Sequence, residues 1–268
     1  TGTISSSNSL VGSSTDDNVG VTTVALPNGN YVVISSAWNN GAIIDAGAVT
    51  WGNGTSGITG TISSSNSLLG SVNSDRVGNP GIVVLTNGNY VVRTSNWDNG
   101  AITNVGAITW CDGTLGLSGL VSSSNSLVGA TSSDQIGSSG VLALTNGNYV
   151  ISSSNFDNGS LVNAGAVTWC DGTLSTIGQV TAFNSIVGSI ANDNVGSLVV
   201  PLSNGHYIIA SSQADINSVT DAGAVTWCNG TLATTGIVSA ANSFIGTTAG
   251  DAVGSAVFPM PSGNYLIN

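Results

Sequence analysis

The stretch TISSSNSLVGSSTDDNVG at residues 3–20 returns nearly unchanged as TISSSNSLLGSVNSDRVG at residues 61–78. The central motif of this stretch, N-S-[LIF]-[VLI]-G, is repeated in steps of 58, 59, 59 and 58 residues and begins at Asn8, Asn66, Asn125, Asn184 and Asn242. Self-similarity at a fixed period of this length is typical of repeat proteins, in which each unit is one supersecondary module. The sequence therefore predicts a tandem array.

Three further motifs recur in the same order and at the same spacing. The motif D-x-[VI]-G begins at Asp17, Asp75, Asp134, Asp193 and Asp251. The motif N-G-[NH]-Y, or S-G-N-Y in the last copy, ends at Tyr31, Tyr90, Tyr149, Tyr207 and Tyr265. The motif G-A-[VI]-T-W ends at Trp51, Trp110, Trp169 and Trp227. We expect one β-repeat domain over residues 1–268, with an N-terminal strand at 1–10 and repeats at about 11–69, 70–128, 129–187, 188–245 and 246–268.

Each unit has the pattern of four short antiparallel strands. In the first copy these are VTTVAL (21–26), YVVIS (31–35), GAVTW (47–51) and the polar TISSSNSLLG (61–70). The first strand is a nearly continuous apolar run, as expected of a strand buried on both faces. An Asn-Gly pair follows it at Asn28, which predicts a tight hairpin with positive φ at both turn residues.

One meander of this size cannot bury both of its faces, so neighbouring units must stack on it. Four strands per unit is the size of a propeller blade. We therefore expect an all-β fold, a β-propeller built from four-stranded blades of about 59 residues, about five in number with the last incomplete. The apolar first strand would lie at the centre as an edge strand, which suits Pro201 and Pro259. The array would either close as a ring or be a piece of a longer array, and the second is favoured.

Composition narrows the function. Among 268 residues there are only two basic side chains, no Lys, no Glu and a single His, and the net charge is −11. The chain lacks most of the side chains that usually perform general acid/base chemistry or bind phosphate. We therefore expect no enzyme, no cofactor and no nucleic-acid partner. No apolar run reaches the roughly 18 residues of a membrane helix, so no membrane span is expected. A surface of Ser, Thr, Asn and Gly indicates an extracellular or cell-surface protein.

The order G-x4-D-x-[VI]-G, apolar strand, Asn-Gly turn, Y-V-V-x-S-S strand and G-A-V strand resembles the FG-GAP repeat of integrin-alpha-type β-propellers. It is also similar to repeats of bacterial haemagglutinin-like cell-surface proteins. The resemblance covers the whole chain and implies adhesion. FG-GAP blades often carry a D-x-D-x-D-G calcium loop between their first two strands, whereas here that connection is only P-N-G-N, T-N-G-N, S-N-G-H or P-S-G-N. The calcium site is therefore not expected.

Candidate binding residues lie in the long loops that follow the second strands. These loops contain WNNG, WDNG and FDNG, which supply Trp38, Trp97, Phe156, Asp98 and Asp157. The aromatic rings could stack on a sugar or a partner protein, or they could pack between adjacent blades. The repeated aspartates of the D-x-[VI]-G motif could form a weak calcium site. A turn in which the carboxylate accepts nearby backbone N–H groups is favoured, so no metal site is expected.

Three other sets of residues are expected to be structural. Trp51, Trp110, Trp169 and Trp227 should pack between blades. Cys111, Cys170 and Cys228 occupy equivalent positions in successive units, so they should be small buried residues rather than disulfide or zinc ligands. His206 replaces an Asn in a hairpin turn and is expected to be a polar turn residue.

The sequence thus predicts a non-catalytic extracellular repeat protein with a structural or adhesive role, assembling into a surface layer or fibre. Its expected partners are further copies of itself or a cell-surface glycan or protein. The alternative is a lectin-like propeller that binds carbohydrate through Trp38, Trp97 and Phe156.

Overall fold

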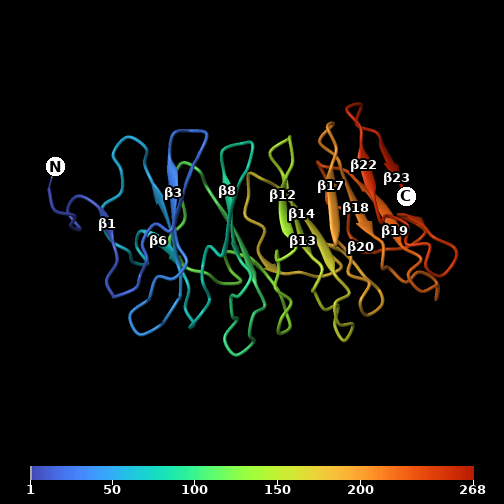
Figure 1. Ribbon diagram of the computed structural model, residues 1–268, viewed down its shortest axis with the longest axis horizontal. Coiled ribbons are helices and arrows are strands. Elements are labelled where there is room, and N and C mark those ends of the chain that lie inside the picture. The colour runs from blue at the N-terminus through green and yellow to red at the C-terminus, as the bar shows by residue number, and fades with distance from the viewer. Residues whose placement is uncertain (1) are drawn as a thin grey trace.

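The chain folds into a row of small β-sheets, one per repeat. The computed structural model describes residues 2–268, so Thr1 of the predicted N-terminal strand lies outside the described residues. Figure 1 shows the sheets following one another along the longest axis, with the N-terminus at one end and the C-terminus at the other. The all-β repeat prediction is confirmed. The closed ring expected of a propeller is not formed by the described residues, because successive sheets stack along a line instead of surrounding one centre.

Three antiparallel strands form the main part of the sheets of the first four repeats, and the fifth repeat has the first two of these strands. The first strands are β2 (Thr22–Ala25), β7 (Pro80–Val84), β12 (Gly140–Ala143), β17 (Leu198–Pro201) and β22 (Val257–Pro259). The second strands begin at the repeated tyrosine and are β3 (Tyr31–Ser35), β8 (Tyr90–Thr94), β13 (Tyr149–Ser153), β18 (Tyr207–Ser211) and β23 (Tyr265–Ile267). The third strands are β4 (Ala48–Gly52), β9 (Ala107–Cys111), β14 (Ala166–Cys170) and β19 (Ala224–Cys228). These match the first three predicted strands.

The predicted fourth strand is instead two short strands. A linking strand comes first, in β5 (Gly60–Thr61), β10 (Gly119–Leu120), β15 (Gly178–Gln179) and β20 (Gly236–Ile237). A closing strand follows, in β6 (Ser67–Leu69), β11 (Leu127–Val128), β16 (Ile186–Val187) and β21 (Phe244–Ile245), with β1 (Leu10–Val11) as its N-terminal equivalent. The closing strand pairs antiparallel with the third strand of its own repeat. The linking strand pairs parallel with the closing strand of the preceding repeat.

An asparagine separates the two short strands. Asn66 Oδ1 accepts the backbone N–H of Ser63 at 2.9 Å, and its Nδ2 donates to the Thr61 carbonyl at 3.0 Å. Side-chain bonds of this kind compete with a strand ladder for the same backbone groups. The four-stranded antiparallel meander is therefore wrong in its last strand, and the linking strand that results ties each repeat to its predecessor.

The first hairpin also differs in detail from the prediction. Gly29 has a φ of 87°, but Asn28 does not have positive φ. The Gly29 N–H donates to the Leu26 carbonyl, and the Leu26 N–H donates to the Asn30 carbonyl. This is a three-residue hairpin loop that ends in a left-handed glycine. The hairpin itself is confirmed, and only the two-residue turn with positive φ at both positions is wrong.

The hydrophobic cores lie between the sheets. Successive residues of a strand point to opposite faces, so Val92 packs toward the first repeat while Val91 packs toward the third. Both are fully buried. The second and third strands supply most of this core, whereas the first strands are half exposed. The expectation that the first strand is buried on both faces is therefore wrong, because it lies at the open edge of each sheet.

Pro201 and Pro259 lie in these first strands, so their predicted edge position is confirmed. Nowhere in residues 2–268 does a helix have the length and apolar character needed to cross a membrane.

Replacing Asn66 by Ala removes the side chain that separates β5 from β6. We expect the free energy of unfolding to fall by about 1–2 kcal/mol, because the bonds to Ser63 and Thr61 are lost together. Urea titration followed by tryptophan fluorescence measures the change. Ser64→Ala, in the same exposed loop, is the control and should be nearly neutral. Equal stability of both variants would show that this asparagine does not hold the break between the strands.

Candidate functional site: the contacts between repeats

The aromatic residues predicted to bind a ligand lie in the core. Trp38, Trp97 and Phe156 expose only 2%, 3% and 3% of their surface. Each packs in a cluster that joins its own repeat to the preceding one. The prediction of stacking on a sugar or partner is corrected here, because no ring face is open to solvent. The alternative of packing between repeats fits their positions.

The two aspartates predicted beside these rings accept hydrogen bonds within their loops. Asp98 Oδ1 accepts the Asn104 N–H at 2.7 Å, and Asp157 Oδ1 accepts the Asn163 N–H at 2.8 Å. Asp157 Oδ2 also accepts from the Thr131 hydroxyl at 3.2 Å. Both carboxylates therefore close the long loop after the second strand, and neither meets an aromatic face open to a ligand.

The repeated aspartates of the D-x-[VI]-G motif connect two loops. Asp75 Oδ2 accepts the N–H groups of Ser71 and Val72 at 2.7 and 2.8 Å, while Oδ1 accepts the Asp98 N–H at 3.0 Å. Burial raises the pKa of Asp75, and the three backbone donors act against that shift. The turn interpretation fits these contacts, since both carboxylate oxygens accept backbone N–H groups. No group of three or more metal-ligating side chains occurs in residues 2–268.

The most regular polar contact between repeats converges on one carbonyl. The Gly113 carbonyl, in the turn after the third strand of the second repeat, accepts three bonds from the first repeat. The donors are Trp51 Nε1 at 3.0 Å, Asn28 Nδ2 at 2.8 Å and Asn30 Nδ2 at 3.1 Å. We call this arrangement the three-donor clamp. It binds the hairpin turn and the third strand of one repeat to a single backbone atom of the next.

The three-donor clamp occurs at the next two interfaces as well. At Gly172 the donors are Trp110, Asn87 and Asn89, and at Gly230 they are Trp169, Asn146 and Asn148. Glycine is required at the acceptor, because a Cβ on Gly113 would collide with the carbonyl of Gly88. The predicted role of Trp51, Trp110 and Trp169 in packing between repeats is confirmed, since each also packs against a core cluster that spans two repeats.

The fourth repeat has two of the three donor side chains, Trp227 and Asn204, without the equivalent acceptor. Trp227 is 45% exposed, and no carbonyl of residues 2–268 accepts from its Nε1. Its predicted packing between repeats is therefore not realised. His206 replaces the second asparagine and accepts the Gly230 N–H on Nδ1 at 3.2 Å, which confirms its turn role. Its ring lies edge-on to Trp227, with centroids 4.8 Å apart.

The sequence contains every part of the three-donor clamp but does not show how the parts pair. The tryptophan, the N-G-N turn and the glycine after the third strand recur with the same period. That shared period is the signal that could have linked them. Their contact is not evident from the sequence, because the partners are 62 to 85 residues apart in the chain.

The three cysteines are free and buried, as predicted. Burial raises the pKa of the Cys111 and Cys170 thiols to about 12 and that of Cys228 to about 11. In the first repeat Gly52 takes this place, and the Tyr31 ring fills the space that a side chain there would need. The thiols are thus packing groups, not nucleophiles.

Trp110→Phe keeps an aromatic ring but removes the donor to Gly172. We expect the free energy of unfolding to fall by about 1 kcal/mol, because one neutral hydrogen bond between repeats is lost. The matched control is Trp227→Phe, which removes the same atom where no carbonyl accepts it and should change stability little. Guanidinium titration measures both. Equal losses in the two variants would show that the clamp bond does not stabilise the stack.

The buried thiols predict a loss of stability at alkaline pH. In the unfolded chain they ionise near their ordinary pKa of 9.0, but in the folded chain only near 11 to 12. The protonated thiols therefore make their full contribution to the free energy of unfolding below about pH 9, and this contribution declines as the pH rises toward 12. Urea titrations from pH 7 to 11 should show that decline, while a disulfide reagent at pH 8 should label no thiol until the chain is denatured. Rapid labelling of the native chain would contradict the burial.

Comparison with known proteins agrees with the repeat organisation. A family model described as a repeat of unknown function, DUF5650, matches residues 1–21, 25–79, 84–138, 143–197 and 201–255. No curated protein matches the chain. The matched segments include most of the sequence and follow the period of the three-donor clamps. The chain therefore belongs to the DUF5650 repeat family.

Proposed function

We propose that this chain is a non-catalytic structural or adhesive protein that acts outside the cell, and that its repeats serve to build an extended, self-associating stack. The observation that carries this proposal is the three-donor clamp, which is formed by equivalent residues at three successive interfaces. Identical units that present identical contacts favour open, head-to-tail assembly. Each repeat then functions by forming the interface with the next repeat.

The surface at the C-terminal end supports association with a further repeat. Phe244 and Leu266 are 62% and 57% exposed there, whereas the equivalent Ile186 and Ile208 in the interior are fully buried by the following repeat. Trp227 lies exposed on the same repeat with its Nε1 free of any carbonyl of residues 2–268. In the interior, another repeat of the same family covers this surface. We propose that a further repeat of the same kind covers this surface.

The composition supports the remaining parts of the proposal. A chain with no Lys or Glu and one His has few groups for acid/base catalysis. Its net charge of −11 opposes nucleic-acid binding. The resemblance to FG-GAP and haemagglutinin-like repeats favours adhesion at a cell surface. Carbohydrate binding through Trp38, Trp97 and Phe156 is not proposed, because those rings are buried.

Sedimentation velocity over a range of concentrations, with electron microscopy of the same samples, tests the proposal. We expect mass to increase with concentration and elongated particles to grow along one axis. Trp227→Lys should abolish that growth, because it places a charge on the exposed apolar surface. Phe183→Lys is the matched control, since Phe183 is 96% exposed in an outer loop of the third repeat.

A chain that stays monomeric at all concentrations would overturn self-association. Loss of growth in both variants would show that general surface hydrophobicity, not the C-terminal surface, drives it. Turnover of a substrate by the purified chain would overturn the non-catalytic assignment.

A further inference from the structure

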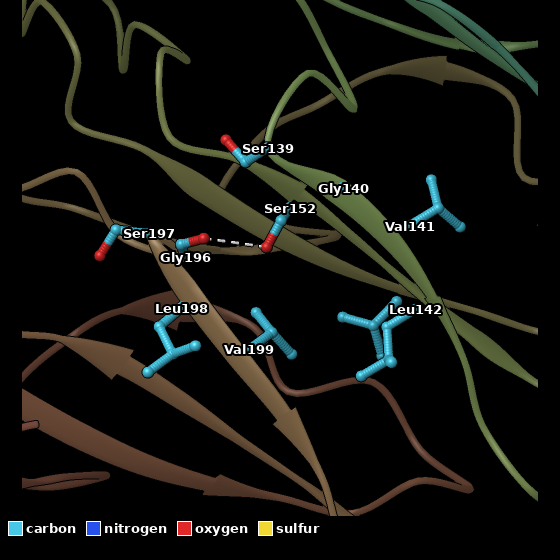
Figure 2. A pocket seen from close by; sticks show the side chains of 10 residues that line it. Ser139, Gly140, Val141, Leu142, Ser152, Gly196, Ser197, Leu198 and Val199 are labelled. Carbon is cyan, nitrogen blue, oxygen red and sulfur yellow. Dashed lines mark hydrogen bonds between the residues drawn. The ribbon is translucent and has the colours of Figure 1, made fainter. Parts of the chain in front are cut away.

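A small groove opens between the third and fourth repeats. It has a volume of about 190 Å³ and lies between β12 and β17, the exposed first strands of the two sheets. Figure 2 shows its lining, with Ser152 donating to the Gly196 carbonyl across one end and Val141, Leu198 and Val199 providing apolar surface. The groove is smaller than the roughly 300 Å³ at which sites for drug-sized ligands begin. It therefore suits a small ligand or one protruding side chain.

The equivalent place between the second and third repeats is occupied by an arginine of the chain. Arg93 in β8 is the counterpart of Ser152 in β13, since each is the fourth residue of its second strand. The Arg93 guanidinium donates from one Nη to the carbonyls of Gly137 and Ser138, at 2.9 and 3.3 Å. The counterparts of these acceptors in the fourth repeat are Gly196 and Ser197. Both line the groove.

The groove lies at a repeat position whose side chain changes from copy to copy. The position holds Ile34, Arg93, Ser152 and Ala210 in successive repeats. Ile34 packs beside Gly78 in the way that Arg93 reaches Gly137. Ser152 is much shorter than either side chain, and its single hydroxyl reaches only Gly196 at 2.9 Å. The backbone acceptors that bind a guanidinium one repeat earlier are thus left beside an open space.

We propose that this groove is a binding site for a guanidinium group carried on a short alkyl chain, either a free alkylguanidine or an arginine side chain of a partner protein. The Gly196 and Ser197 carbonyls would accept its N–H groups, as Gly137 and Ser138 accept those of Arg93. A carbonyl oxygen has two lone pairs, so Gly196 can accept a second bond beside that of Ser152. The alkyl chain would lie on Val141, Leu198 and Val199. The site is separate from the surfaces proposed for self-association.

The chemistry favours guanidinium over other cations. A guanidinium is planar, is weakly hydrated and presents several N–H donors in a fixed arrangement, whereas an ammonium is a strongly hydrated point charge. Two adjacent backbone carbonyls beside apolar side chains fit a guanidinium better than an ammonium. The negative charge of the chain attracts any cation to the surface but does not distinguish between them.

The test is a titration of the whole chain with N-propylguanidine, followed by amide NMR shifts. We expect saturable shifts at Ser152, Gly196 and Ser197. N-propylurea, which is neutral and has nearly the same shape, should bind about tenfold more weakly, since the charge-assisted bonds are lost. A second arm uses an acetylated, amidated Gly-Arg-Gly peptide. Tighter binding of the peptide assigns the site to a partner's arginine, and tighter binding of the small guanidine assigns it to a free ligand.

Ser152→Arg places in the groove the arginine that the second repeat has at this position. The variant should therefore abolish the shifts caused by either ligand. If this variant does not fold, Ser152→Ile fills the groove with the residue of the first repeat and serves the same purpose. Ser123→Arg, on an exposed outer loop, is the matched control and should bind as the unaltered chain does. Equal affinity for guanidine and urea, or shifts that persist when residue 152 is enlarged, would overturn the proposal.

Discussion

Each sheet has apolar side chains on both faces, and this constraint governs the whole molecule. The second strand alternates its side chains, so Val91 and Val92 need cover on opposite sides. A single repeat has no second layer with which to provide that cover. The stable state is therefore a row in which every sheet acts as the second layer for its neighbours. The large side chains of the loops, such as Trp97 and Phe156, are buried for the same reason.

Within this apolar stack, side chains bound to the backbone supply the specificity that charged pairs often supply elsewhere. The described residues contain one ion pair, between Arg76 and Asp45. In contrast, the three-donor clamp, the aspartates of the D-x-[VI]-G motif and the asparagines between the short strands all bond to main-chain groups. Such groups are neutral and fixed in place by the sheet, so the three-donor clamp sets the position of a neighbouring repeat at little desolvation cost. This explains how a chain without Lys or Glu can position its sheets.

Some positions of the repeat keep nearly the same residue in successive copies, whereas others vary, and the two kinds of position have different effects. Positions at the clamp keep the same chemistry in the first three repeats, which gives three equivalent interfaces. The fourth residue of the second strand instead changes from Ile34 to Arg93, Ser152 and Ala210 on the same backbone. Ile34 and Arg93 reach the equivalent glycine of the following repeat, whereas Ser152 leaves a groove beside it. A repeat array can in this way acquire a local site without altering its fold.

The sequence by itself determined the period, the three main strands, the edge position of the prolines and the burial of the cysteines, because these follow from local patterns of polarity and turn residues. Only the tertiary structure decided how the repeats are joined. The serine-rich segment divides into β5 and β6 because Asn66 bonds to its own backbone, which a strand pattern does not show. The linear arrangement and the buried Trp38, Trp97 and Phe156 likewise depend on contacts between residues far apart in the chain. A periodic sequence specifies that neighbours must meet, but the angle and offset at which they meet are set by packing across the interface.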